Sequence, residues 1–313
     1  MACIVCSTIQ LSAIEEWVSY EFSGGRFGDN LLAYLHAKWF AFEHNLPLLY
    51  RPFNYSDQLK IHDADRHFSN PPSPAYRTPV WRWPMKHSTA LNVIYMCPYF
   101  PDNLRENTSI EQAASFVEQR NFRIDWENPQ FRRMVQELVA PKQPLSLTRP
   151  PAGSVSIAMH IRHGGGYDTD DSPYKMPMKL PPVEFYIQGL KTILDLFPDQ
   201  LIYCYLFTDA QVPEALAHQI FKAFPQVNRL TLDYRRSNNQ HNANVLEDFF
   251  SLFEFDALIH PLSNFSIVPA RIHDYAVTLA PQTFSKDTKN HIVKIMQTDL
   301  RINQKRYQEL LQK

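Results

Sequence analysis

Apolar residues in the second half of the chain follow two different spacings. Four short runs of mostly apolar residues, each bounded by turn residues, predict buried strands. These runs are 154–161, 201–209, 227–234 and 256–260. Between and after them, apolar residues recur every three or four positions, which predicts helices. These segments are 182–198, 212–224, 244–255 and 265–276, the last interrupted near Pro269. Strands that alternate with helices favour a parallel sheet covered on both faces, so the predicted fold class is α/β.

The first half of the chain has a weaker pattern of the same kind. Residues 28–45 have the apolar spacing of a helix, and residues 46–52 have the composition of a strand. Two further segments, 110–119 and 129–139, also have helical spacing. We therefore expect α/β structure in this half as well.

Prolines gather in two segments, 70–84 and 140–153. The second is polar and directly precedes the well-patterned half, so it predicts a linker between domains. A chain of 313 residues is also longer than most single cores. We expect an N-terminal α/β domain over 1–150, a C-terminal α/β domain over 151–285, and a polar helical tail over 286–313 that packs back.

Composition and charge exclude several classes of protein. The formal net charge of -1 gives no basic face for a nucleic acid. The chain has no run of about 18 apolar residues, so we expect no membrane span. The first residues also lack the positive charge with which a secretory signal begins. Cys3 and Cys6 form a single C-x-x-C, without the second pair that a zinc ribbon needs. We expect a cytoplasmic protein.

Six of the eight glycines lie in two clusters. One cluster is Gly24, Gly25 and Gly28, and the other is Gly164, Gly165 and Gly166. Glycine lets backbone N–H groups approach a ligand, and loops after parallel strands are where open α/β sheets bind ligands. The clusters therefore indicate a ligand cleft between two domains, with ordinary turns as the alternative. Their spacing matches neither a dinucleotide-binding loop nor a P-loop.

Charged groups border the second glycine cluster. Arg162 lies where the strand at 154–161 meets the cluster, and a guanidinium matches phosphate oxygens with two hydrogen bonds. The alternative is a surface arginine in a salt bridge. His160 points to the same side of the strand as Arg162, so it is either a nucleotide contact or a buried core residue. His163 points the other way.

Two strand ends carry further polar groups. Asp209 ends the segment 201–209, where a carboxylate faces the binding edge of a parallel sheet. The segment 263–266 follows the predicted strand at 256–260 and opens a helix, where hydroxyl and N–H groups suit an anion. Helix capping is the alternative for both, and it would also explain Asp29.

Four stretches in this order resemble the superfamily of fucosyltransferases that use GDP-fucose. "GGRFGDNLLAYLHAKWFAFEHNLPLLY" resembles their G-R-[FL]-G-N-Q helix, and "SIAMHIRHGGGYD" resembles H-x-R-R-G-D-Y. "YLFTDA" is similar to F-[ST]-D-D, and "LEDFFSLFEFDALIHPLSNFSIVPARI" resembles the segment that ends in S-x-F-S. The likeness spans most of residues 22–280, apart from about 52–150.

The resemblance implies a GT-B-like fold of two facing Rossmann-like domains, the N-terminal one on the acceptor side and the C-terminal one binding the nucleotide sugar. It implies an inverting, metal-independent transfer of fucose from GDP-fucose to a glycan or protein hydroxyl, without a further cofactor. The residues implied to bind the GDP-sugar are Gly25, Arg26, Gly28, His160, Arg162, His163, Gly164, Asp209, Ser263, Asn264, Phe265 and Ser266.

Within this implied site, His160 would contact the nucleotide and Arg162 the β-phosphate. An inverting attack needs a group that accepts the proton of the acceptor hydroxyl, and Asp29 and Asp170 are the candidates. The chain departs from the motifs at His163, which stands in place of the second arginine, and at Gly165, which stands in place of the aspartate.

Three alternatives remain open. One is a GDP- or glycan-binding protein without catalysis, given the altered motif residues. The second is a histidine phosphatase, in which His163 would be phosphorylated and His273 and Asp274 would assist. The third is a metal-dependent transferase that uses the D-T-D at 168–170.

Overall fold

The computed structural model describes residues 17–20, 22, 25–67, 76–77, 93–96, 124–163, 172–237, 239–289 and 292–312. The chain divides into two compact units. The described residues of the first unit fall within Met1–Ser23, Ala33–Pro52 and His62–Asp125. Those of the second unit fall within Gly24–Leu32, Phe53–Ile61 and Trp126–Lys313. The boundary differs from the expected division at residue 150, because residues 126–150 belong with the C-terminal sheet.

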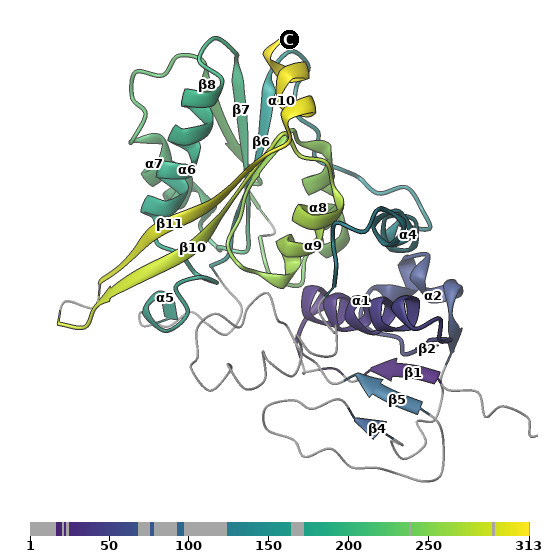
Figure 1. Ribbon diagram of the computed structural model, residues 1–313. Coiled ribbons are helices and arrows are strands. Elements are labelled where there is room, and N and C mark those ends of the chain that lie inside the picture. Colours follow the sequence, from purple (N-terminus) through teal and green to yellow (C-terminus); the bar gives the residue numbers. More distant parts are fainter. Residues whose placement is uncertain are drawn as a thin grey trace, which may run out of the picture. The chain divides into compact units, whose positions relative to one another are not determined.

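The second unit is built on a six-stranded sheet with the strand order β11-β10-β9-β6-β7-β8 (Figure 1). The strands are β6 Val155–Ile161, β7 Ile202–Thr208, β8 Leu230–Tyr234, β9 Ala257–Ile259, β10 Val277–Asp287 and β11 Ile292–Ile302. All neighbouring pairs run parallel except β10 and β11, which form an antiparallel hairpin. The expected α/β class with a parallel sheet is confirmed.

Helices cover both faces of this sheet, with α6 and α7 on one side and α8 and α9 on the other (Figure 1). Their bounds are α6 Val183–Leu196, α7 Pro213–Phe221, α8 Val245–Ser251 and α9 Asn264–Ile272. The shorter or peripheral helices are α4 Pro129–Val139, α5 Ser172–Lys175, η4 Leu252–Glu254 and α10 Gln304–Leu311. Every strand and helix predicted between residues 154 and 276 is therefore present within a few residues of its expected bounds.

Side chains along the central strands alternate between two apolar clusters. On one face, Ile157 and Met159 of β6 join residues of α6, α7 and α10. On the other face, Ala158 joins Tyr205 and Phe207 of β7 and residues that follow α8. Because both faces are buried, these strands read as nearly continuous apolar runs in the sequence, which is why they were predictable.

The first unit holds small parallel pairings. β1 Trp17–Tyr20 pairs with β5 Val93–Met96, which in turn pairs with β4 Tyr76–Arg77. β2 Leu49–Tyr50 pairs with β3 Arg66–His67. Helix α1 spans Phe27–Glu43, and its residues up to Leu32 belong to the second unit. The short helix α2 Ile61–Ala64 lies mostly in the first unit, whereas η1 Ser56–Gln58 belongs to the second. The predicted helix at 28–45 is confirmed as α1, whereas the helix predicted at 110–119 lies outside the described residues.

The expected helical tail over 286–313 is wrong for most of its length. Residues 292–302 form β11, and only Gln304–Leu311 is helical. In the outer halves of β10 and β11 no residue is fully buried, and the burial patterns vary only between exposed and half-buried positions. Without fully buried positions, the sequence carries only a weak signal for a strand. Among the described residues, no helix is long and apolar enough to cross a membrane.

Candidate functional site

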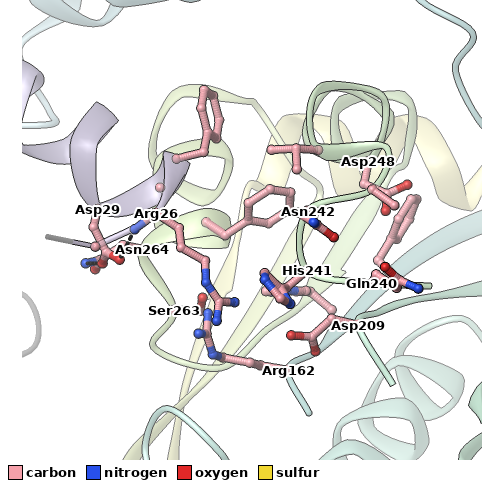
Figure 2. Close-up of a pocket in the computed structure, with 18 of the residues that line it drawn as sticks. Arg26, Asp29, Arg162, Asp209, Gln240, His241, Asn242, Asp248, Ser263 and Asn264 are labelled. Carbon is pink, nitrogen blue, oxygen red and sulfur yellow. Dashed lines mark hydrogen bonds between the residues drawn. The ribbon is translucent and has the colours of Figure 1, made fainter. Parts of the chain in front are cut away.

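A cavity of about 270 Å³ lies in the second unit. Its walls come from the C-terminal ends of β6 and β7, from the start of α9, from the first turn of α1 and from the segments 54–55 and 240–248. Open parallel sheets bind ligands at the carboxyl ends of their strands, so the cavity lies where this fold places a ligand. Figure 2 shows the side chains that face it.

Two arginines line the cavity from different parts of the chain. Arg162 directly follows β6, and Arg26 directly precedes α1. Figure 2 shows their guanidinium groups directed toward one another, beside Ser263. A guanidinium is charged at every physiological pH and binds phosphate oxygens through two parallel N–H groups. Two converging guanidinium groups therefore suit a ligand with more than one negative charge.

Asp29 fixes the first turn of α1 instead of standing free in the cavity. Its Oδ2 accepts from the backbone N–H of Arg26 at 3.0 Å, the reciprocal half of a capping box. Its Oδ1 accepts from the side-chain amide of Asn264 at 2.6 Å (Figure 2). Both carboxylate oxygens thus help to hold α1 and the start of α9 together, and Asp29 also lines the cavity.

The glycines of the first cluster serve this same contact. A Cβ on Gly28 would lie 2.6 Å from the backbone nitrogen of Phe265, and a Cβ on Gly25 would lie 2.3 Å from Oδ2 of Asp29. Real Cβ atoms do not approach other atoms so closely, so a side chain at Gly28 would force α1 away from α9, and one at Gly25 would displace the side chain of Asp29. From the sequence, we expected these glycines to let the backbone approach a ligand. The structure shows that Gly28 also lets α1 approach the backbone of α9 closely.

Asp209 connects two strand ends at the cavity edge. Its Oδ1 accepts from the backbone N–H of His163 at 2.6 Å. The alternative of an N-cap for α7 does not apply, because Val212 is the N-cap and no side chain caps that helix end. Asp209 therefore positions the chain that follows Arg162. The side chain of His163 is exposed and does not line the cavity.

His160 is buried to 8% exposure and lines the cavity from β6. Its ring centroid lies 5.3 Å from that of Phe265, and its Nδ1 has no hydrogen-bond partner among the described residues. The pKa of His160 is lowered to about 3, mainly by burial; Asp209 opposes this shift, and Arg162 and His260 contribute to it. The imidazole is therefore neutral at physiological pH and can act as either a donor or an acceptor.

The start of α9 brings three of the four residues of the 263–266 segment to the cavity. Ser263, Asn264 and Phe265 line it, whereas Ser266 is fully buried behind them. Ser263 occupies the N-cap position, but its side chain makes no capping bond, and its buried Oγ has no partner among the described residues. The hydroxyl and the first N–H groups of α9 together suit an anion.

Several lining residues escaped the sequence-based prediction. Tyr55 has a positive φ of 70°, a conformation that costs a bulky residue energy, and its hydroxyl donates to the backbone oxygen of Asn242 at 3.2 Å. Asp248 of α8 is held by both terminal nitrogens of Arg235, and burial raises the pKa of this carboxyl although Arg235 opposes the shift. Lys179 lies in the turn before α6. Of Tyr55, Asp248 and Lys179, only Asp248 lies within one of the motif stretches.

Some predicted residues fall outside the described part of the chain. They are Gly24, Gly164, Gly165, Gly166, Asp168 and Asp170. Within the described residues, no three histidine, cysteine, aspartate or glutamate side chains gather in a group that could hold a metal ion.

Comparison with known proteins gives structural matches only. No family model and no curated protein matches the chain. The NodZ fucosyltransferase from Bradyrhizobium is 14% identical, with a TM-score of 0.46 over 93% of this chain and 100% of that chain. POFUT1 in complex with GDP-fucose is 11% identical, with a TM-score of 0.43 over 85% of this chain and 96% of that chain.

A variant of Arabidopsis thaliana FUT1 in complex with GDP is 11% identical to the chain. Its TM-score is 0.48, over 88% of this chain and 72% of that chain. The superfamily expected from the sequence motifs is thus also represented among similar solved structures. At these identities and TM-scores, the likeness assigns neither a substrate nor a reaction.

Proposed function

We propose that this protein is an inverting glycosyltransferase that transfers fucose from GDP-fucose to a glycan or protein hydroxyl. The observation that carries the proposal is the pair of guanidinium groups, Arg26 and Arg162, that converge in a cavity at the carboxyl edge of a parallel sheet. The motifs of the chain specify the same edge and the same two arginines. The donor is a substrate, and we propose no metal or further cofactor.

The two arginines would act on the leaving group. When the bond between the sugar C1 and the diphosphate oxygen breaks, the electron pair and the negative charge move to the diphosphate. Arg26 and Arg162 would stabilise that charge as it develops, together with the N–H groups at the start of α9. Donors fixed in advance are effective here because they need no reorganisation during the reaction.

The opposite part of the cavity would hold the nucleoside. It is lined by Phe207, by the segment 240–243 and by the half-buried carboxylate of Asp248. Each oxygen of Asp248 accepts one hydrogen bond from Arg235 and keeps a further lone pair, which can accept from the N–H groups that guanine carries on its pairing edge. An aromatic wall suits a flat base. The neutral ring of His160 lines the same cavity, two residues before Arg162 on β6, and it would bind either the base or the ribose.

The proton of the acceptor hydroxyl needs a destination. Asp29 connects the first turn of α1 to the start of α9, so we assign it to positioning. Asp170 is the remaining candidate for the base from the sequence motifs. Its removal is expected to reduce transfer to an acceptor more than it reduces the binding of GDP.

The histidine phosphatase interpretation has little support from the geometry. The side chain of His163 lies outside the cavity. His273 packs between the rings of Phe253 and Tyr275, and Asp274 pairs with Arg132 at 2.9 Å. None of these groups is directed at a common reacting atom.

The test is turnover of GDP-fucose, measured as the release of GDP in the presence of glycan acceptors. We expect Arg162→Ala to lower the rate by about 10²–10³ while the protein stays folded. Arg133→Ala, which changes an exposed arginine of α4, is the matched control and should retain full turnover. Equal rates in the wild type and Arg162→Ala would contradict the proposal. Binding of GDP without turnover in the wild type would instead assign a binding protein.

A further inference from the structure

Lys179 lines the same cavity as Arg26 and Arg162, although it belongs to none of the motifs. It lies in the turn between α5 and α6, and its neighbours Met178 and Leu180 are buried to 4% and 5% exposure. Lys179 itself is half-buried. Buried residues on both sides fix the backbone at this point, so the fold sets where the lysine side chain begins.

Hydrogen bonds tie this turn to the start of α9. The N–H groups of Lys179 and Leu180 donate to the oxygen of Met176, which closes the turn. The N–H of Leu262 donates to the oxygen of Met178 at 2.8 Å. Leu262 directly precedes Ser263, the N-cap of α9. Lys179 therefore stands beside the end of the cavity that Ser263 and the first N–H groups of α9 form.

Among the described residues, the three carboxylates that line the cavity all accept hydrogen bonds from other groups of the protein. Asp29 accepts from Arg26 and Asn264, Asp209 accepts from the backbone of His163, and Asp248 pairs with Arg235. The cavity residues that carry positive charge are Arg26, Arg162 and Lys179. A diphosphate that has lost its sugar carries more negative charge than the two guanidinium groups neutralise, and burial makes that imbalance costly. His163 supplies no charge here because its side chain is exposed outside the cavity.

We infer that Lys179 is a third cation for the diphosphate, and that it binds the terminal phosphate from the side of α9. This inference rests on the proposed binding of a nucleoside diphosphate. The ammonium group of lysine is a compact charge on a flexible stem, so it can follow the phosphate as its charge increases. Lys179, and not His163, would then complete the positive charge beside Arg162.

The experiment is titration calorimetry of the full chain with GDP and with GMP, which lacks the terminal phosphate. We expect Lys179→Met to weaken GDP binding by about 10- to 100-fold, the usual contribution of a charge-assisted hydrogen bond. GMP binding should change by less than about threefold. Lys179→Arg should restore most of the affinity for GDP. Lys175→Met, which changes the exposed lysine at the end of α5, is the matched control.

His163→Ala tests whether His163, and not Lys179, supplies the further positive charge. We expect this substitution to weaken GDP binding by less than about threefold. Equal GDP affinity in the wild type and Lys179→Met would overturn the inference and leave the proposed function intact. Equal losses for GDP and GMP in Lys179→Met would also overturn it. A wild type that binds neither nucleotide would overturn the proposed function itself. Thermal unfolding of each variant confirms that the protein is folded before binding is compared.

Discussion

Two buried histidines occupy equivalent positions on neighbouring strands of the main sheet. Met159 of β6 pairs with Ile259 of β9, and His160 and His260 follow them by one residue each. Their exposed fractions are 8% and 5%, and burial lowers their pKa values to about 3 and about 4. By residue type, depth and protonation state, the two side chains are nearly the same.

Their hydrogen bonds differ. Nδ1 of His260 lies 2.9 Å from the oxygen of Pro261, and His260 does not line the cavity. Nδ1 of His160 has no partner among the described residues, and its ring lines the cavity. A buried polar group without a partner is destabilising, so it indicates a function that stability alone does not explain. Hydrogen bonding, and not burial or pKa, therefore separates the structural histidine from the candidate ligand contact.

The largest expected effect is the loss of stability on substitution of His260, the structural histidine. His260→Ala removes a buried ring and its hydrogen bond, so we expect the free energy of unfolding to fall by about 2–4 kcal/mol. GDP affinity of the folded protein should not change. Urea unfolding and calorimetry measure the two quantities. His218→Ala, at an exposed position of α7, is the control. A selective loss of GDP binding in His260→Ala would show that the two histidines are not distinct.

A substitution at Gly28, which lies against the backbone of Phe265, should affect both stability and GDP binding. Gly28→Ala places a methyl group 2.6 Å from the backbone nitrogen of Phe265, whose ring packs against His160. Backbone cannot move as a side chain can, so we expect a loss of about 1–3 kcal/mol in stability together with weaker GDP binding. Gly153→Asn is the control, because nothing lies near a Cβ there and asparagine tolerates its positive φ. Unchanged unfolding and binding in Gly28→Ala would rule out the close contact.

His160→Leu tests the ligand-binding member directly. The substitution removes a buried polar atom that lacks a partner, so stability should be unchanged or higher. GDP binding should weaken by about tenfold, because one hydrogen bond to the ligand is lost. Denaturation and calorimetry on the same protein give both values. A destabilisation as large as that of His260→Ala, with GDP affinity retained, would make His160 a structural residue.

The smallest expected effect is on the pH dependence of the free energy of unfolding. Both histidines have folded-state pKa values below their ordinary value, so above about pH 6.5 neither state of the chain binds a proton there. As the pH falls below that value, the unfolded chain is protonated first, and the folded state loses stability down to about pH 3. Urea unfolding at pH 7, 6 and 5 should show a smaller loss in His160→Leu than in the wild type. Identical slopes would contradict the lowered pKa of His160.

The parts of the fold that the sequence predicted are those whose burial follows a simple period. β6 and β7 are buried on both faces and read as apolar runs, and α4 has its expected bounds because Asn128 caps it and Pro129 begins it. The β10–β11 hairpin was not predicted, because its outer half has no buried side. Its position depends on pairing with β9, which no local pattern encodes.

The site was predictable where a motif coincided with a strand end, as at Arg162 and Asp209. Lys179 and Tyr55 were missed because they lie in irregular segments. Their positions are fixed by hydrogen bonds to distant parts of the chain, from Leu262 to Met178 and from Tyr55 to Asn242. Asp29 was predicted as part of the site, but its engagement with Asn264 required the fold to be known.

The most direct measurement of the central claim is a thermal-shift comparison of nucleotides with the wild-type protein. A ligand that binds only the folded state raises the unfolding temperature with concentration. We expect GDP and GDP-fucose to stabilise the protein more than GMP, UDP or ADP do, because the cavity combines converging cations with a carboxylate suited to guanine. No stabilisation by any nucleoside diphosphate would contradict the assignment of this cavity as a nucleotide-sugar site.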